Sequence, residues 1–231
     1  METKRVYNTF AEATLLGTKL LAILIDPEKF DLATATRFLN GLPENTSHIF
    51  VGGSTVSPGD TQRLIETLKI DTSLPIIIFP GDYTQIADAA DGLLFLSLLS
   101  GRNPEYLIGQ QVKAAALLKD SPLEVIPTGY ILVDGGHDSA VARVTQTQPM
   151  STAAIDKIVH TAKAGALMGA KLIYLEAGSG ALYPIPSTII SEVKKVLEIP
   201  LIVGGGIRTN QQKQEAYASG ADLVVMGTVF E

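Results

Sequence analysis

The sequence predicts an α/β protein of the TIM (β/α)8 barrel type, in which eight parallel strands alternate with helices. Two observations carry this prediction. Short runs rich in Ile, Leu and Val recur eight times along the 231 residues, and the segments between them favour helices. Strict alternation favours a parallel sheet, and eight such units close into a barrel. The expected strands are 19–26, 48–54, 75–81, 92–99, 124–134, 171–177, 200–206 and 223–228.

The connecting segments contain two clear helical patterns and two departures from a regular barrel. Residues 104–119 and 155–168 each place apolar side chains at helical spacing. The connection 82–91 has room for at most two helical turns, so we expect one flank of the barrel to be thinly covered. Only residues 229–231 follow the eighth strand, so the closing eighth helix is missing from this sequence.

Composition favours one domain spanning residues 1–231. A 46% hydrophobic content at this length supports one large core. No apolar stretch reaches the roughly 18 residues of a membrane span, and no signal-peptide pattern is present. We therefore expect a soluble cytoplasmic protein without a transmembrane segment. The lack of cysteine excludes disulfides and a cysteine nucleophile, and the net charge of −6 argues against nucleic-acid binding.

The last two predicted strands end in glycines. Residues 201–208 read Leu-Ile-Val-Gly-Gly-Gly-Ile-Arg, and residues 223–228 read Leu-Val-Val-Met-Gly-Thr. The loops after strands seven and eight of these barrels commonly bind phosphate, and glycine lets backbone N–H groups approach an anion closely. The sequence therefore predicts a phosphate site at these two loops. Alternatively, the glycines only form tight strand-to-helix turns.

Polar residues at other strand ends are candidates for the chemistry, because active sites of these barrels lie at the carboxyl ends of the strands. Asp26 follows the first strand, and Ser54 follows the second. A carboxylate and a hydroxyl there can hold Mg²⁺, which shares its coordination with water and substrate phosphates. Asp26 can instead cap the helix that starts near Asp31 or its own loop. Ser54 can instead belong to an ordinary turn.

The sixth strand ends in a phenol and a carboxylate. Alternation along a strand sends Tyr174 and Glu176 to one side and Leu175 to the other. If that side is the barrel interior, reduced solvation raises the carboxyl pKa toward the range of a general base. The alternative is a structural ion pair between Glu176 and a Lys or Arg.

Several segments resemble the geranylgeranylglyceryl phosphate synthase family, which includes bacterial heptaprenylglyceryl phosphate synthases. The segments occur in order over nearly the whole chain, and those with Tyr-Leu-Glu and Ser-Gly-Arg-Asn-Pro are fairly specific. The three-glycine motif is shared by many phosphate-binding barrels. The matching segments are 24–29 (Leu-Ile-Asp-Pro-Glu-Lys), 50–54 (Phe-Val-Gly-Gly-Ser), 95–104, 127–132, 174–180 (Tyr-Leu-Glu-Ala-Gly-Ser-Gly), 203–208 and 226–228.

The resemblance implies a Mg²⁺-dependent prenyltransferase of ether phospholipid biosynthesis. Such an enzyme joins sn-glycerol 1-phosphate to a polyprenyl diphosphate, here expected to be geranylgeranyl diphosphate, and is expected to be a homo-oligomer, a dimer or a hexamer. Carried over by motif, Asp26 and Ser54 bind Mg²⁺, and Glu176 with Tyr174 forms the catalytic pair. The glycerol phosphate ligands implied are Tyr174, Leu175, Glu176, Ala177, Gly178, Ser179, Gly180, Gly204, Gly205, Gly227 and Thr228.

The resemblance also implies an altered region around the third helix that leaves a groove for the prenyl chain, which agrees with the short connection 82–91. One position departs from the family pattern. Some members have Lys two residues before the aspartate, where this sequence has Leu24. A phosphate contact expected there must come from another residue or be absent.

Two other functions are compatible with the same barrel, because architecture does not determine the reaction. A phosphosugar isomerase or epimerase predicts a second acid or base opposite Glu176 and a compact pocket without an apolar groove. A non-catalytic sensor of phosphate ligands predicts binding without turnover.

Overall fold

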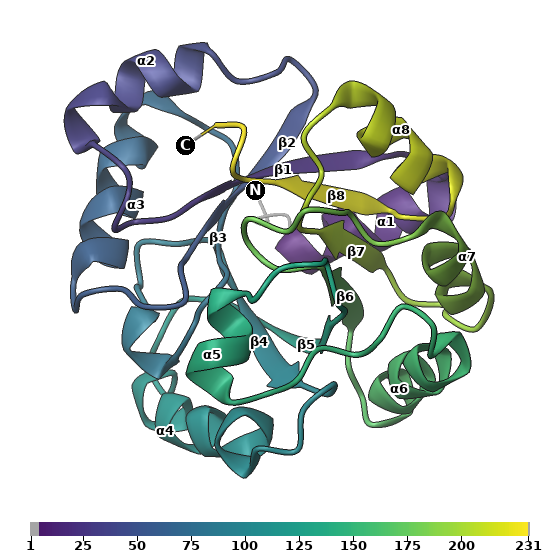
Figure 1. The fold of residues 1–231 in the computed structure, drawn as a ribbon. Coiled ribbons are helices and arrows are strands. Elements are labelled where there is room, and N and C mark those ends of the chain that lie inside the picture. Colours follow the sequence, from purple (N-terminus) through teal and green to yellow (C-terminus); the bar gives the residue numbers. More distant parts are fainter. Residues whose placement is uncertain (1–4, 231) are drawn as a thin grey trace.

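The computed structural model describes residues 5–230, which form a closed barrel of eight parallel strands in chain order (Figure 1). Strand β8 pairs with β1 and so closes the barrel. The predicted fold class is confirmed, and each predicted strand overlaps an observed one, although β2 begins and ends earlier than predicted and β3 and β7 are shorter. The strands are β1 (Leu20–Ile25), β2 (Thr46–Val51), β3 (Ile76–Ile78), β4 (Gly92–Leu98), β5 (Glu124–Leu132), β6 (Leu172–Glu176), β7 (Leu201–Gly204) and β8 (Leu223–Met226).

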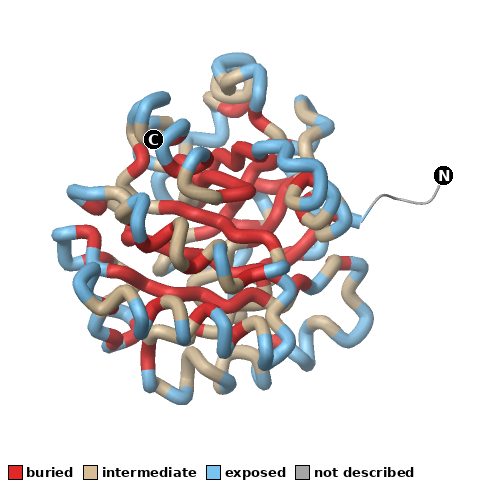
Figure 2. Tube along the Cα trace, turned by 90° about the vertical axis from the view of Figure 1, so that its right-hand side faces the viewer, coloured by how far each residue is buried: buried red, intermediate tan, exposed pale blue. Residues whose placement is uncertain are grey.

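Successive side chains of each strand point alternately into and out of the barrel. Ala22, Phe50 and Tyr174 belong to the cluster that fills the interior. Leu21 and Leu175 belong to a cluster outside it that includes helix residues. The strands are therefore largely buried on both faces, which Figure 2 shows as long red segments. This double burial explains why the strands read as nearly unbroken apolar runs.

Helices surround the barrel (Figure 1). The helix predicted at 155–168 is α6, whereas the one predicted at 104–119 begins with a single π-helical turn, η3 (Glu105–Gly109), before α4. Gly109, a poor helix former, stands where the two join. Besides η3 and the short η2 described below, the helices are α1 (Val6–Leu16), η1 (Leu32–Thr34), α2 (Ala35–Asn40), α3 (Asp60–Asp71), α4 (Gln110–Leu117), α5 (Ala140–Thr145), α6 (Ile155–Leu167), α7 (Ser187–Lys195) and α8 (Asn210–Ala218).

The flank between β3 and β4 is thinly covered, as predicted. It contains only a short 3₁₀ helix, η2 (Tyr83–Gln85). The buried Gln85 amide ties this connection to the loop after β2, because its Nε2 donates to the Gly53 carbonyl at 2.8 Å. The β3–β4 connection thereby supports the loop that carries Ser54.

The described chain ends shortly after β8. Residues 227–230 form no helix, and Glu231, the last residue of the sequence, lies outside the described residues. Within residues 5–230, no helix is both long enough and apolar enough to cross a lipid bilayer.

Helix α1 closes the amino-terminal end of the barrel. Glu124, the first residue of β5, accepts hydrogen bonds from the backbone N–H groups of Val6 and Tyr7 at the start of α1. Phe10 of α1 packs in the interior cluster, with its ring centroid 4.9 Å from that of His48 on β2. His48 is therefore buried beneath the helix, at the end of the barrel opposite the strand-end glycines.

We predict that His48 makes folding sensitive to acid. Burial lowers the pKa of His48 from 6.5 to about 4, so below pH 6.5 the unfolded chain binds a proton that the folded chain does not. The burial of His48 therefore costs no stability well above pH 6.5, and the free energy of unfolding falls as the pH drops from 6.5 toward 4. Linkage gives a loss of about 1–2 kcal/mol between pH 7 and pH 5.

Urea unfolding of the parent and His48→Gln at pH 7 and pH 5 measures this loss. The parent should lose more stability than the variant between the two pH values. Equal losses would show that His48 does not titrate in this range.

Candidate active site

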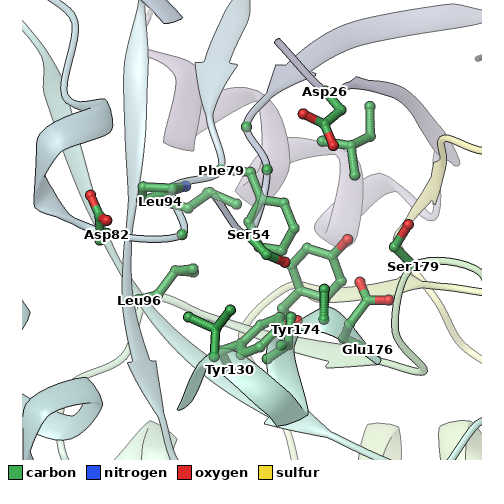
Figure 3. A pocket seen from close by; sticks show the side chains of 18 of the residues that line it. Asp26, Ser54, Phe79, Asp82, Leu94, Leu96, Tyr130, Tyr174, Glu176 and Ser179 are labelled. Carbon is green, nitrogen blue, oxygen red and sulfur yellow. The ribbon is translucent and has the colours of Figure 1, made fainter. Parts of the chain in front are cut away.

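A cavity of about 320 Å³ opens at the carboxyl ends of the strands. Residues predicted from separate strand ends line it together: Asp26 after β1, Ser54 after β2, Glu176 on β6, and Gly205 and Gly227 after β7 and β8. Figure 3 shows several of these side chains directed toward one space. The cavity lies at the end of the barrel where such folds place their active sites. It is lined in addition by Tyr174, Gly178, Ser179 and Thr228.

Glu176 is a buried carboxyl group at the end of β6, with 5% of its surface exposed. Burial raises the pKa of Glu176 to about 7, against the opposing effect of a 2.7 Å hydrogen bond donated by the Gly178 N–H. The nearby Tyr174 hydroxyl also lowers this pKa, although the two groups do not reach hydrogen-bond geometry. Among residues 5–230, Glu176 forms no ion pair, so the structural ion-pair alternative is not observed. The predicted rise in its pKa is confirmed.

Tyr174 and Glu176 converge on a single glycine. A Cβ at Gly204 would lie 2.4 Å from the Tyr174 hydroxyl oxygen and 3.0 Å from Glu176 Oε2. The Tyr174 side chain is fully buried, and its hydroxyl has no hydrogen-bond partner in the described chain. A buried hydroxyl normally has a partner. The Tyr174 hydroxyl therefore lies next to the Glu176 carboxyl group at the wall of the cavity without a hydrogen-bond partner of its own.

The glycine loops have the properties of an anion site. Gly205 and Gly206 have φ angles of +81° and +72°, which glycine adopts without strain. The N–H groups of Gly205, Gly206 and Gly227 donate no hydrogen bond within residues 5–230, and all three residues line the cavity. The positive φ values also agree with the tight-turn alternative, because a turn and an anion site require the same backbone. A tight turn does not require three unpaired N–H groups facing a cavity, so these groups favour the anion-site hypothesis.

Four predicted ligand positions do not line the cavity. Leu175 and Ala177 point outward into the cluster between barrel and helices, as alternation along β6 requires. The Gly204 backbone lies behind Tyr174 and Glu176. Gly180 lies beside the His137 ring, with the nearest ring atoms 3.8 Å from the position of a Cβ. These four residues shape the loops, while their neighbours face the cavity.

Asp26 provides a carboxylate that a metal ion can reach. Its side chain is 19% exposed, and Oδ2 lies 3.5 Å from Lys29 Nζ. Its Oδ1 accepts a hydrogen bond from the Glu28 N–H at 3.1 Å, so Asp26 caps its own loop, as the alternative predicts. A Cβ at Gly53 would lie 2.6 Å from Oδ1, so only glycine fits beneath the carboxylate.

The available oxygen ligands suit Mg²⁺ better than a metal ion whose ligands all come from the protein. No group of three or more His, Asp or Glu side chains in residues 5–230 is arranged to hold a metal ion. Mg²⁺ commonly uses one or two carboxylates and takes its remaining ligands from water and substrate phosphates. Asp26 with the Ser54 hydroxyl fits this mode of binding.

The other half of the cavity is apolar, and sequence reasoning missed its residues. It is formed by side chains from β4, the β3–β4 connection and helices α4 and α5, with aromatic rings beside the polar half (Figure 3). A search for polar residues and glycines at strand ends finds the acids and the glycine loops, but it does not find apolar residues that line the same cavity. Only the matching segments 95–104 and 127–132 drew attention to part of this region. The missed residues include Phe79, Ile86, Leu94, Leu96, Leu98, Tyr106, Tyr130, Val141 and Val144.

Leu24 occupies the position where a lysine was expected from the resemblance. Its side chain lies beside Gly227, with Leu24 Cβ 3.5 Å from the position of a Cβ there. No positive charge therefore comes from this position. In the described chain, the cationic side chains that line the cavity are Lys29 and Arg208, and Arg208 Nη2 donates to the Ala181 carbonyl at 2.7 Å.

The fold and the cavity together have the features of an enzyme of the (β/α)8-barrel class, with a buried carboxyl group between a polar and an apolar compartment. Comparison with known proteins agrees: the PcrB family model matches residues 16–231. The chain belongs to the PcrB family.

Named relatives extend over nearly the whole chain. A geranylgeranylglyceryl phosphate synthase of Zunongwangia profunda is 53% identical over 98% of this chain and 97% of its own length. The synthase of Flavobacterium johnsoniae is 51% identical over 98% of this chain and 93% of its own. Among solved structures, (S)-3-O-geranylgeranylglyceryl phosphate synthase from Thermoplasma acidophilum, in complex with its substrate sn-glycerol-1-phosphate, has a TM-score of 0.90. It is 34% identical and covers 99% of this chain and 92% of that one.

Proposed function

We propose that this protein is a prenyltransferase that joins sn-glycerol 1-phosphate to a polyprenyl diphosphate through an ether bond, for ether-lipid synthesis. One observation carries the proposal: Glu176, whose pKa is raised to about 7, lies in a cavity that is polar on one side and apolar on the other. Such a site suits a hydrophilic nucleophile and a lipid electrophile. The names of the relatives support the same reaction.

The glycerol phosphate is placed in the polar half. Its phosphate accepts hydrogen bonds from the free N–H groups of Gly205, Gly206 and Gly227. Ser179 and Thr228 line the same part of the cavity. This position brings the glycerol hydroxyl toward Glu176 and the unpartnered Tyr174 hydroxyl.

The reaction breaks the bond between C1 of the prenyl group and the diphosphate oxygen, and the electron pair leaves with the diphosphate. The glycerol hydroxyl oxygen forms the new bond to C1, and Glu176 accepts its proton. Asp26 and Ser54 would hold Mg²⁺, which stabilises negative charge on the leaving group. The apolar side chains that line the other half disfavour water, which would otherwise compete as the nucleophile.

The direct test is product formation from sn-glycerol 1-phosphate and geranylgeranyl diphosphate with Mg²⁺, using sn-glycerol 3-phosphate as the stereochemical control. We expect ether product with the 1-phosphate. Failure with every prenyl diphosphate would favour the isomerase hypothesis, although the apolar half of the cavity already disfavours a compact sugar-phosphate pocket. The homo-oligomer implied by the resemblance stays a prediction.

We predict that Gly205→Ala weakens binding of sn-glycerol 1-phosphate by about 10-fold or more, the effect of losing hydrogen bonds to a charged ligand. The added Cβ would lie 2.3 Å from Glu176 Oε1 and 2.7 Å from the Gly178 nitrogen, which displaces the loop. Gly59→Ala is the matched control, because Gly59 has a similar φ of +87° with open space around it. Calorimetry should show weakened binding only for Gly205→Ala, and unchanged affinity would contradict the assignment.

A further inference from the structure

Three aromatic rings meet where the polar and apolar halves of the cavity join. Phe79 follows β3, Tyr130 lies on β5 and Tyr174 lies on β6. Phe79 stacks on Tyr174, with ring centroids 5.0 Å apart and planes at 18°. The Tyr130 centroid lies 5.7 Å from Phe79 and 5.5 Å from Tyr174. The predicted ligand, metal and base residues include neither Phe79 nor Tyr130.

The backbone holds this aromatic cluster in place. Tyr130 and Tyr174 are direct partners in the β5–β6 register, and both side chains are buried. The Phe79 N–H donates to the Val51 carbonyl at 2.9 Å. A Cβ at Gly52 would lie 1.8 Å from the Phe79 carbonyl oxygen, so glycine is required for this close approach. Phe79 keeps part of its surface exposed, while the two tyrosines support it.

The position of the rings matches the reacting carbon of the proposed substrate. In Figure 3 the Phe79 and Tyr174 rings lie between Leu94 and Leu96 on one side and Asp26 and Glu176 on the other. The diphosphate belongs with the polar half, and the prenyl chain belongs with the apolar half. In the proposed complex, C1, which joins them, would therefore lie against the aromatic cluster.

The charges in the cavity suit a cation at this point. When the C1–oxygen bond breaks, positive charge spreads over the allylic carbons, and the face of an aromatic ring attracts a cation within about 6 Å of its centroid. Burial raises the pKa of Tyr130 and of Tyr174 well above the usual value, so both phenols stay neutral. Lys29 lies near Asp26, and Arg208 donates a hydrogen bond to the Ala181 carbonyl, so both of these cationic side chains lie on the polar side of the cavity.

We propose that Phe79, held against Tyr174 and beside Tyr130, is a catalytic residue whose ring stabilises the allylic cation. This inference rests on the proposed prenyl transfer and adds a residue to it. The ring takes no part in bond exchange: C1 loses the diphosphate, gains the glycerol oxygen, and the proton goes to Glu176. The ring accelerates the reaction because its attraction for the allylic carbons is strongest at the stage when they carry the most positive charge.

A fluorination series at Phe79 tests this role with little change in shape. Incorporation of mono-, di- and trifluorophenylalanine withdraws electron density from the ring face in steps. Single-turnover rates of ether formation should fall progressively, by about 3- to 30-fold in total, as expected for a desolvated cation–π contact. The affinity for sn-glycerol 1-phosphate should stay constant. The same series at Phe38, which pairs edge-to-face with Phe30 and does not line this cavity, is the control.

The outcomes separate this inference from the proposed function. A parent protein that forms no ether product overturns both. An active parent whose rate is unaffected by fluorination at Phe79 overturns only the role of the ring, as does an equal effect at Phe38. A stepwise loss of rate at Phe79 alone, with glycerol phosphate binding unchanged, supports the inference.

Discussion

Glu176→Gln should fold normally, bind sn-glycerol 1-phosphate and turn over about 10²- to 10⁴-fold more slowly, the usual contribution of a general base. The amide keeps the shape of the carboxyl group but cannot accept the proton of the attacking hydroxyl. The structure supports this role, because the carboxyl group lies beside Gly204, Gly205 and the Tyr174 hydroxyl. Prenyl transfer is the measurement, with melting temperature as the folding control.

The pH dependence gives an independent check. Since the pKa of Glu176 is raised to about 7, the active ionised form is lost as the pH falls through 7. We expect kcat/KM of the parent to rise with pH through this region and the residual rate of Glu176→Gln to lack that rise. Glu192→Gln, at a half-exposed position on α7 that pairs with Lys195, is the matched control and should behave like the parent. Near-parental turnover of a folded Glu176→Gln would remove Glu176 from the mechanism.

Asp26→Asn should lower activity by at least about 10-fold, the size of effect that follows loss of even an outer-shell metal partner. The amide retains the shape but not the charge that attracts Mg²⁺. The residual activity should require a higher Mg²⁺ concentration to reach half its maximum. Steady-state rates over a Mg²⁺ titration measure both effects.

Asp82→Asn is the control for this titration. Asp82 also follows a strand and lines the same cavity, but its carboxylate accepts a hydrogen bond from the Thr84 N–H at 2.7 Å and caps η2. Its replacement should leave the Mg²⁺ requirement unchanged. If Asp26→Asn shows the metal dependence of the parent, Asp26 only caps its own loop through the Glu28 N–H.

Much of the site was predictable because strand ends are visible in the sequence. An apolar run that stops at Asp26, Ser54, Glu176 or glycine marks a strand and its carboxyl end, and in a parallel barrel all carboxyl ends meet at one mouth. Apolar residues at that mouth carry no such mark. Phe79 and Leu94 read as core positions until their surroundings are known.

The sequence by itself determined the order of eight strands, the thin flank between β3 and β4, and the acids and glycines at the mouth of the barrel. Each is a local pattern of apolar runs and turn residues. Only the tertiary structure decided that Tyr130 stands opposite Tyr174, that Gly204 makes room for the Tyr174 and Glu176 side chains, and that α1 buries His48. It also decided how far the pKa of Glu176 rises. These features depend on strand register and burial, which join residues distant in the chain and leave no local pattern in it.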